Sequence, residues 1–214
     1  MKTIKVIANL LIIIGILILV LTFSRPIFQE IKYQVNQWQE VKYELGGGGA
    51  EVQRFKGAKV QEIVPLDRDF GIVIPKINAN AKIFANIDPY SEREFLPVLK
   101  KGVAHAKGTA FPGEGSNIYL FAHSTDAFFN FQNYNAVFYL IGKLEKGDEI
   151  DIYYRQNLFK YSVTEKMVVA TDDVKYLKKE NQEILTLQTC YPPGTTLKRL
   201  IVRARLKDLQ KVNL

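Results

Sequence analysis

The sequence predicts a mostly-β domain, folded as a closed sheet or barrel and preceded by an apolar N-terminal helix. From about residue 68 onward, seven or eight short runs rich in Ile, Val, Tyr, Phe and Thr alternate with turn-forming residues. Many short strands with few helices are typical of closed all-β architectures. Ahead of them lie a long uncharged segment and a run of four glycines, which indicate an anchor and a linker.

The uncharged segment covers residues 6–24 and is bracketed by Lys5 and Arg25. As a helix, its 19 residues span roughly 29 Å at about 1.5 Å per residue, which matches the hydrocarbon core of a bilayer. We therefore predict an uncleaved transmembrane anchor over residues 1–24. The alternative is a cleaved signal peptide, although such a peptide has a shorter apolar region and an A-x-A-like cleavage site, which we do not find.

The orientation of this anchor is only weakly encoded. Lys2 and Lys5 lie on one side of the apolar segment, and Arg25 and Lys32 lie on the other, so the charge asymmetry is slight. A large domain that follows a single N-terminal anchor is usually translocated as a unit. We therefore expect a single-pass protein of the cell membrane, with its domain on the extracytoplasmic face.

Residues 25–67 are predicted to form a stalk between the anchor and the domain. Apolar residues in its first part recur at helical spacing: Ile31, Val35, Trp38 and Val41. Gly46–Gly49 then interrupt the helix, because four glycines lose too much backbone entropy to remain helical. The alternative is a helical hairpin packed on the domain.

Residues 68–214 form the predicted β domain. Its strand-like runs are FGIVIP, AKIFANI, SNIYLFAHS, DEIDIYY, KYSVTEKMVVA, EILTLQTC and RLIVRARL. The breakers FPGEGSN, LEKGDE and YPPGTT separate several of them. A short helix is expected within residues 88–101, with Ser91 as its N-cap.

The charge and cysteine content restrict the possible partners. The chain carries 29 basic and 22 acidic residues, a net charge of +7, and the charges are interspersed. This balance suits an anionic membrane or cell-wall surface. No nucleic-acid partner is expected, because no recognition motif accompanies the charge. The single cysteine excludes an internal disulfide, so the core alone must hold the fold.

That cysteine, Cys190, ends a strand-like run and precedes a Pro-Pro-Gly corner. A cysteine attacks as the thiolate, which needs a cation or a proton acceptor nearby. His123 ends the run NIYLFAHS, and Arg199 opens the run that follows the corner. If the runs ending at His123 and Cys190 are neighbours in the same direction, about 4.8 Å apart, the imidazole and the thiol meet at one edge. The corner then returns Arg199 to the same edge.

Each of these residues also has a structural interpretation: Cys190 as inert core, His123 as an ordinary strand-end residue, and Arg199 as a surface charge. Their joint occurrence at three strand ends favours a catalytic site with a nucleophile, a general acid and an oxyanion-binding cation. His105, the other histidine, lies in a glycine-flanked loop and is not expected to be the acid. Arg203 and Arg205 lie further from the end that carries the thiol, so they rank below Arg199.

The run TLQTC, the arginine nine residues after its cysteine and the sequence AHS 67 residues before that cysteine together resemble the sortases. These are membrane-anchored cysteine transpeptidases of bacterial surfaces. The stretch GVAHAKGTAFPGEGSNIYLFAHSTD is also similar to the segment that leads into their histidine strand. The resemblance covers residues 68–207.

The resemblance implies an eight-stranded, sortase-like β-barrel and assigns a role to each site residue. Cys190 attacks the Thr–Gly carbonyl of an LPXTG-like sorting signal in a secreted surface protein and forms a thioester. His123 is the general acid and then the base, and Arg199 binds the substrate backbone or the oxyanion. An amine of a cell-wall precursor or a pilin resolves the thioester. No metal or organic cofactor is implied.

Some features separate this chain from related patterns. Asp-Pro-Tyr at residues 88–90 follows the first strand-like runs, so we do not interpret it as the lid that pilus-building sortases carry ahead of the barrel. The anchor-first layout, with no second apolar segment, favours a general enzyme over a pilus polymerase. The Ser-His-Gly-Cys arrangement of L,D-transpeptidases is absent around Cys190, and the cysteine–histidine order of papain-like proteases is reversed. A non-enzymatic surface scaffold or adhesin is the remaining alternative.

Overall fold

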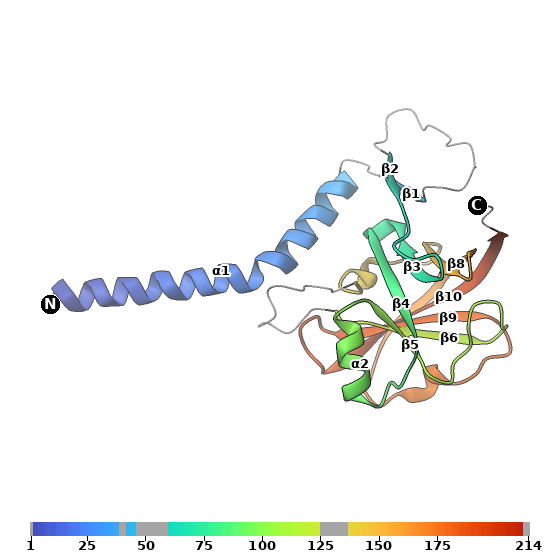
Figure 1. Cartoon of the computed structure of the whole chain (residues 1–214). Helices are drawn as coiled ribbons and strands as arrows, with labels where there is room; N and C mark the ends of the chain where they lie inside the picture. The colour runs from blue at the N-terminus through green and yellow to red at the C-terminus, as the bar shows by residue number, and fades with distance from the viewer. Residues whose placement is uncertain (1, 39–41, 46–59, 125–136, 212–214) are drawn as a thin grey trace. The chain divides into compact units, whose positions relative to one another are not determined.

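The computed structural model describes residues 2–38, 42–45, 60–124 and 137–211 (Figure 1). The chain divides into two compact units, Met1–Gln39 and Glu40–Leu214. The predicted glycine joint, Gly46–Gly49, lies outside the described residues.

The first unit consists of one helix, α1, which runs over Lys2–Trp38 (Figure 1). The helical spacing predicted from Ile31 to Trp38 is therefore confirmed, whereas Val41 lies outside the described residues. The helix continues through residue 25, so the expected division between anchor and stalk does not coincide with a break in secondary structure. Within the described residues, no helix has both the length and the apolar character that a membrane crossing needs.

The second unit contains the predicted closed barrel. Eight strands close in the order β10-β8-β7-β3-β4-β5-β6-β9, and β10 pairs with β9 to complete the ring. The strands are β3 (Phe70–Ile74), β4 (Ala79–Ile87), β5 (Val103–Ala106), β6 (Asn117–Phe121), β7 (Glu149–Tyr154), β8 (Asn157–Val169), β9 (Ile184–Tyr191) and β10 (Lys198–Lys211). The mostly-β, eight-stranded fold is thus confirmed.

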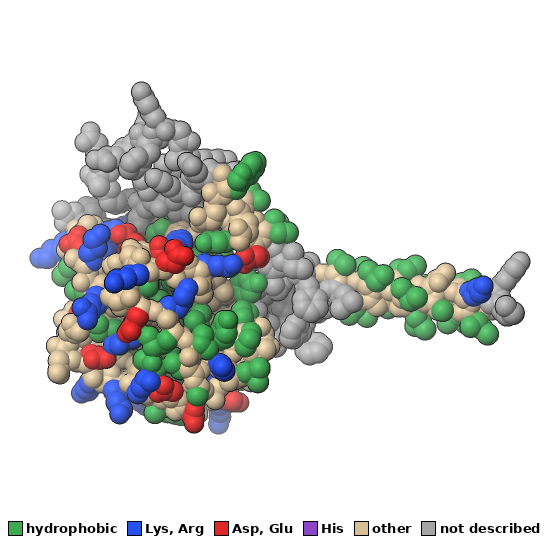
Figure 2. Space-filling view, turned by 180° about the vertical axis from the view of Figure 1, so that it is seen from behind, with side chains coloured by type: hydrophobic (Ala, Val, Ile, Leu, Met, Phe, Trp, Pro, Cys, Tyr) green, Lys and Arg blue, Asp and Glu red, His purple; other side chains and the backbone are tan. Residues whose placement is uncertain are grey.

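The barrel is filled by β-branched and leucine side chains, as the strand-like runs predict. Alternate residues of a strand face the same side of the sheet, so each run contributes several of them to the interior. The fully buried members include Ile72, Ile74, Ile118, Leu120, Ile150, Ile152 and Leu185. On the outer surface, acidic and basic side chains are interspersed, in keeping with the mixed charge of the sequence (Figure 2).

Short helices connect or cover the strands: α2 (Glu92–Leu99) and the 3₁₀ helices η1 (Pro75–Ile77), η2 (Ile141–Lys143) and η3 (Val174–Leu177). α2 is the helix expected within residues 88–101, and Ser91 occupies its N-cap position. The Ser91 side chain makes no capping hydrogen bond, however. Instead the Glu94 carboxylate accepts a hydrogen bond from the Asp88 N–H at 3.1 Å, which ties the helix to the turn before it.

A parallel pair of short strands, β1 (Lys42–Leu45) and β2 (Val60–Ile63), was not predicted. Residues 25–67 were predicted to form a stalk, and in the structure the end of this segment packs against the barrel. Ile63 is buried in a cluster with Val73, Tyr153 and Leu158. The Asn80 side chain also bonds the Val64 carbonyl and the Leu66 N–H, at 2.7 and 2.9 Å. These contacts involve one apolar residue and one side-chain amide, which leave too weak a pattern in the sequence for the packing to be predicted.

Candidate active site

Two parallel strands bring the histidine and the cysteine to the same end of the sheet. β6 and β9 pair in parallel, with Phe121 opposite Gln188. His123 lies two residues beyond Phe121, and Cys190 lies two residues beyond Gln188. Because parallel strands keep their register, both residues stand at the carboxyl end of the pair, as the sequence predicts.

Hydrogen bonds to β9 hold the backbone of the residue just before His123. The N–H of Ala122 donates to the Gln188 carbonyl at 3.2 Å, which extends the β6–β9 ladder past the end of β6. The hydroxyl of the buried Thr189 donates to the Ala122 carbonyl at 2.9 Å. Both backbone groups of Ala122 are therefore bonded to β9, so the residue before His123 is held against the strand that carries Cys190.

Arg199 is the direct cross-strand partner of Cys190 in the antiparallel β9–β10 pair. Its Nη1 lies 3.7 Å from Cys190 Sγ, within hydrogen-bonding range of sulfur. The same nitrogen donates to the carbonyls of Thr196 and Lys198, at 3.4 and 3.3 Å. The turn between the strands thus holds the guanidinium against the thiol, as the Pro-Pro-Gly corner predicts.

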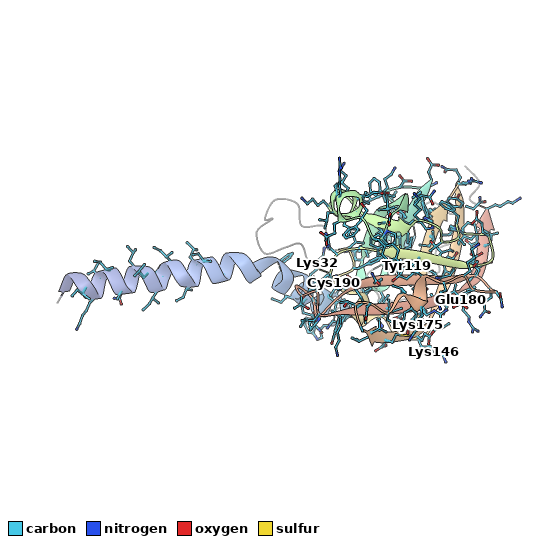
Figure 3. All side chains as sticks on the ribbon, turned by 90° about the horizontal axis from the view of Figure 1, so that it is seen from below. Lys32, Tyr119, Lys146, Lys175, Glu180 and Cys190 are labelled. Carbon is cyan, nitrogen blue, oxygen red and sulfur yellow. The ribbon has the colours of Figure 1, made fainter. Side chains whose placement is uncertain are left out.

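His123, Cys190 and Arg199 line one cavity of about 350 Å³. Part of its lining comes from Pro89 and α2, and another part comes from the turn between β9 and β10. The remaining lining residues are Glu92, Phe95, Leu96, Leu99, Phe121, Ala122, Ser124, Gln188, Thr189, Gly194, Thr195 and Thr196. Cys190 is half-buried and is labelled in Figure 3. A thiol nucleophile, an imidazole and a fixed cation therefore face one space that is large enough for a peptide segment.

The family model of the Sortase domain matches residues 72–207, which is more than half of the chain. The chain belongs to the sortase family. The match covers all eight strands of the barrel apart from the ends of β3 and β10. The resemblance that the sequence motifs indicate is thereby confirmed.

Known sortases are similar to this chain in both sequence and structure. Sortase D of Bacillus subtilis (strain 168) is 32% identical over 133 residues, which cover 60% of this chain and 59% of that protein. Sortase A of Listeria monocytogenes is 24% identical over 141 residues, covering 66% and 57%. A Clostridium perfringens sortase D5 transpeptidase superposes with a TM-score of 0.54 at 30% identity, covering 66% of this chain and 80% of that one. The chain thus spans less than two thirds of the length of the curated sortases it matches.

The other histidine of this sortase, His105, lies in β5 and not in the loop that the sequence predicts. It is fully buried in β5, and its ring packs on Phe111 and Phe70, with centroid distances of 4.5 and 5.7 Å. Its Nδ1 accepts the Asn86 N–H at 3.3 Å, and its Nε2 donates to the Ala110 carbonyl at 2.9 Å. Burial lowers the pKa of His105, so the ring is held neutral. This environment agrees with the prediction that His105 is not the acid.

The two rival arginines also lie away from the thiol. Arg203 forms ion pairs with Glu165 and Glu180, at 2.9 and 2.5 Å, which balance its charge. Arg205 is exposed and pairs in register with Ile184, at the opposite end of β9 from Cys190. Among the described arginines, Arg199 is the one that lines the cavity.

Several residues that shape the site were not predicted from the sequence. The Thr189 hydroxyl donates to the carbonyl of Ala122, 67 residues earlier in the chain, and no local pattern in the sequence reveals that contact. Gln188 lines the cavity, and its side-chain oxygen accepts a hydrogen bond from the Tyr119 hydroxyl. The sequence also did not predict that α2 lines the cavity, although the helix itself was predicted. In the part of the chain that the structure describes, no group of three or more His, Cys, Asp or Glu residues is placed to hold a metal.

Proposed function

We propose that this sortase is a cysteine transpeptidase that cuts an LPXTG-like sorting signal at the Thr–Gly bond and transfers the acyl part to an amine. The observation that carries the proposal is the contact of Cys190 Sγ with Arg199 Nη1, at 3.7 Å, inside a cavity that His123 also lines. These three groups supply what acyl transfer through a thioester requires.

In the acylation half, the Cys190 thiolate attacks the threonine carbonyl carbon, and the developing oxyanion is stabilised by the Arg199 guanidinium. The tetrahedral intermediate collapses with cleavage of the C–N bond. The His123 imidazolium gives its proton to the leaving glycine amine, which departs as a neutral amine. The products are a thioester on Cys190 and a neutral imidazole.

In the deacylation half, an incoming amine attacks the thioester carbonyl. Neutral His123 accepts the proton that the amine loses, and Arg199 again stabilises the oxyanion. The C–S bond then breaks, which releases the new amide and restores the thiolate–imidazolium pair. The proton that His123 gives up in the first half is taken back in the second, so the cycle restores the starting protonation state of the site.

The proposed acyl donors are secreted proteins that carry a C-terminal sorting signal, and the acceptor is an amine of a cell-wall precursor or a pilin. The relatives named sortase D and sortase A support this assignment of partner class. A non-enzymatic scaffold or adhesin is not favoured, because the thiol is half-buried beside a guanidinium rather than sealed in the core.

The proposed location is the cell membrane, with α1 as a single-pass anchor and the barrel on the extracytoplasmic face. The uncharged run of residues 6–24 supports this location, although the described part of the chain contains no helix that meets the length and apolar character of a membrane span. Ile12, Ile13 and Ile14 follow one another on α1, with exposed fractions of 59%, 62% and 42%. Consecutive residues point about 100° apart, so apolar side chains lie exposed on more than one face of the helix.

Carbonate extraction of membranes that contain the full-length chain tests this location. The wild-type chain is expected to stay in the pellet, and Ile13→Arg with Leu17→Arg is expected to release it, because each arginine costs about 2.5–3.5 kcal/mol at mid-membrane. Extraction of the wild-type chain would contradict the anchor.

The activity is tested with the full-length chain in detergent micelles, a fluorogenic LPXTG-type peptide and an amine acceptor. We expect cleavage and transfer that disappear in Cys190→Ala. His123→Ala is expected to lower kcat/KM on the order of 10³-fold, because the loss of one member of a catalytic group removes most of the effect of the whole group. Arg205→Ala, which changes an exposed residue of the same sheet, serves as the control with unchanged kinetics. Turnover that persists in Cys190→Ala would overturn the proposal.

A further inference from the structure

The residue two positions before the cysteine faces the same cavity. Gln188 and Cys190 both line it, and both are half-buried. Alternate residues of a strand face the same side, about 6.6–6.8 Å apart. The Gln188 side chain therefore lies about two peptide units along the groove from the nucleophilic sulfur.

A hydrogen bond from Tyr119 fixes the orientation of the Gln188 side-chain amide. Its Oε1 accepts a hydrogen bond from the hydroxyl of Tyr119, on the neighbouring strand β6. Tyr119 is itself 3% exposed and packs in a cluster with Leu99 and Phe121. Tyr119 is labelled with Cys190 in Figure 3. Burial raises the pKa of Tyr119, so its hydroxyl remains a donor throughout the working pH range.

This arrangement leaves a donor for the cavity. A glutamine amide has an acceptor oxygen and two N–H donors. Because the Tyr119 hydroxyl donates to the oxygen, the NH₂ group is the part of the oriented amide that can donate to a molecule in the groove. A peptide that lies extended past Cys190 presents backbone carbonyls, which are acceptors that require such a donor once they are removed from water.

We propose that Gln188 binds the acyl-donor peptide by donating from its side-chain NH₂ group to a backbone carbonyl, one or two residues from the scissile bond, and that Tyr119 is the positioning residue that holds the amide in this orientation. The inference rests on the proposed transpeptidation, since it names how the same cavity recognises its substrate. Backbone recognition of this kind fixes the register of the peptide, because it places the scissile carbonyl over the sulfur.

The test compares steady-state kinetics of the full-length chain in micelles, with an LPXTG-type peptide, for Gln188→Glu and Tyr119→Phe. Gln188→Glu keeps the size of the side chain and an oxygen for Tyr119 but removes the NH₂ donor. It is expected to raise KM about tenfold, the effect of one lost hydrogen bond, with kcat within about threefold. Tyr119→Phe removes only the anchor and is expected to raise KM about threefold.

Two matched controls and one independent readout accompany these variants. Gln182→Glu makes the same charge change at an exposed position, and Tyr154→Phe removes a hydroxyl from another strand; both are expected to keep the wild-type KM. Alkylation of Cys190 by iodoacetamide is expected to proceed at the wild-type rate in Tyr119→Phe and in both controls, because no peptide is involved and none of these changes places a charge beside the thiol.

Binding of a labelled peptide to Cys190→Ala, followed by fluorescence anisotropy, separates this inference from the proposed function. We expect Gln188→Glu in that background to weaken binding about tenfold. The inference is overturned if the wild-type chain turns over while KM and binding in the Gln188 and Tyr119 variants match the controls, or if the loss in Tyr119→Phe appears as slower alkylation. A wild-type chain that neither binds nor cleaves the peptide overturns the proposed function and this inference together.

Discussion

The two ends of the β9–β10 pair use arginine for opposite purposes. At the carboxyl end of β9, Arg199 donates to two backbone carbonyls and to the thiol of Cys190. Toward the other end, Arg203 is balanced by the carboxylates of Glu165 and Glu180. The role of a cation therefore depends on what balances its charge. Carbonyl dipoles hold Arg199 in place and leave its positive charge available to an oxyanion.

The largest expected difference between the two ends is in the kinetics of Arg199→Ala and Arg203→Ala. We expect Arg199→Ala to lower kcat/KM on the order of 10³-fold with an unchanged thermal midpoint. Arg203→Ala leaves two carboxylates unbalanced and is expected to lower the unfolding free energy by about 1 kcal/mol with kcat/KM preserved. Peptide turnover and thermal unfolding of both variants check this pair. An equal loss of activity in both would remove the distinction between the two ends.

A smaller effect is expected from two threonines of β9. Thr189→Val removes the hydroxyl that holds the Ala122 carbonyl, so the segment that enters His123 loses an anchor. We expect kcat to fall about tenfold, because the imidazole is less well positioned. Thr186→Val removes a hydroxyl that donates to Asn117 Oδ1 at 2.8 Å, further from the cavity. That variant is expected to cost about 1 kcal/mol of stability and to leave kcat unchanged.

The measurement is single-turnover acylation, with thermal unfolding as the check on folding. If Thr186→Val slows acylation as much as Thr189→Val, the threonines stabilise the strand in general and do not orient the histidine.

The smallest effect on activity is expected from a buried charge at neither end of the β9–β10 pair. Asp151 of β7 is fully buried, and its carboxylate has no hydrogen-bond partner, although Lys160 Nζ lies 3.6 Å away. Burial and the charge of Glu149 raise the pKa of Asp151 from 3.8 to about 7. The folded state therefore binds more protons than the unfolded state between these values, so this group destabilises the fold progressively as pH rises from about 4 to 7.

We expect Asp151→Asn to raise the urea midpoint at pH 8 and to change it less at pH 5, where the native carboxyl is largely protonated. Urea unfolding at the two pH values checks the sign. A variant that is destabilised more at pH 8 than at pH 5 would mean that the carboxylate, paired with Lys160, stabilises the fold.

The features that the sequence could predict are those with a local signal. Strand-like runs with breakers predict the barrel, and the parallel placement of the strands leading to His123 and Cys190 follows from the requirement that a thiol and an imidazole meet. Arg199 follows from the turn between its strand and that of the cysteine. That His105 is not the acid stays a prediction, and it is supported by a ring that packs on two phenylalanines and is bonded at both nitrogens.

The features that the sequence could not predict depend on contacts between distant segments. Ile63 packs on three residues from other strands, so the stalk interpretation of its segment had no local evidence against it. The Tyr119–Gln188 bond joins positions 69 residues apart, and neither residue type alone indicates a substrate contact. Ser91 shows the converse, because it occupies the predicted N-cap position without making the capping bond.

The most direct test of the account is intact-mass spectrometry of the full-length chain mixed with an LPXTG-type peptide in the absence of an amine acceptor. We predict an added mass equal to the peptide up to its threonine, released by hydroxylamine and absent in Cys190→Ala. A chain that cleaves the peptide with no adduct on Cys190, or that carries the same adduct after Cys190→Ala, would contradict the account.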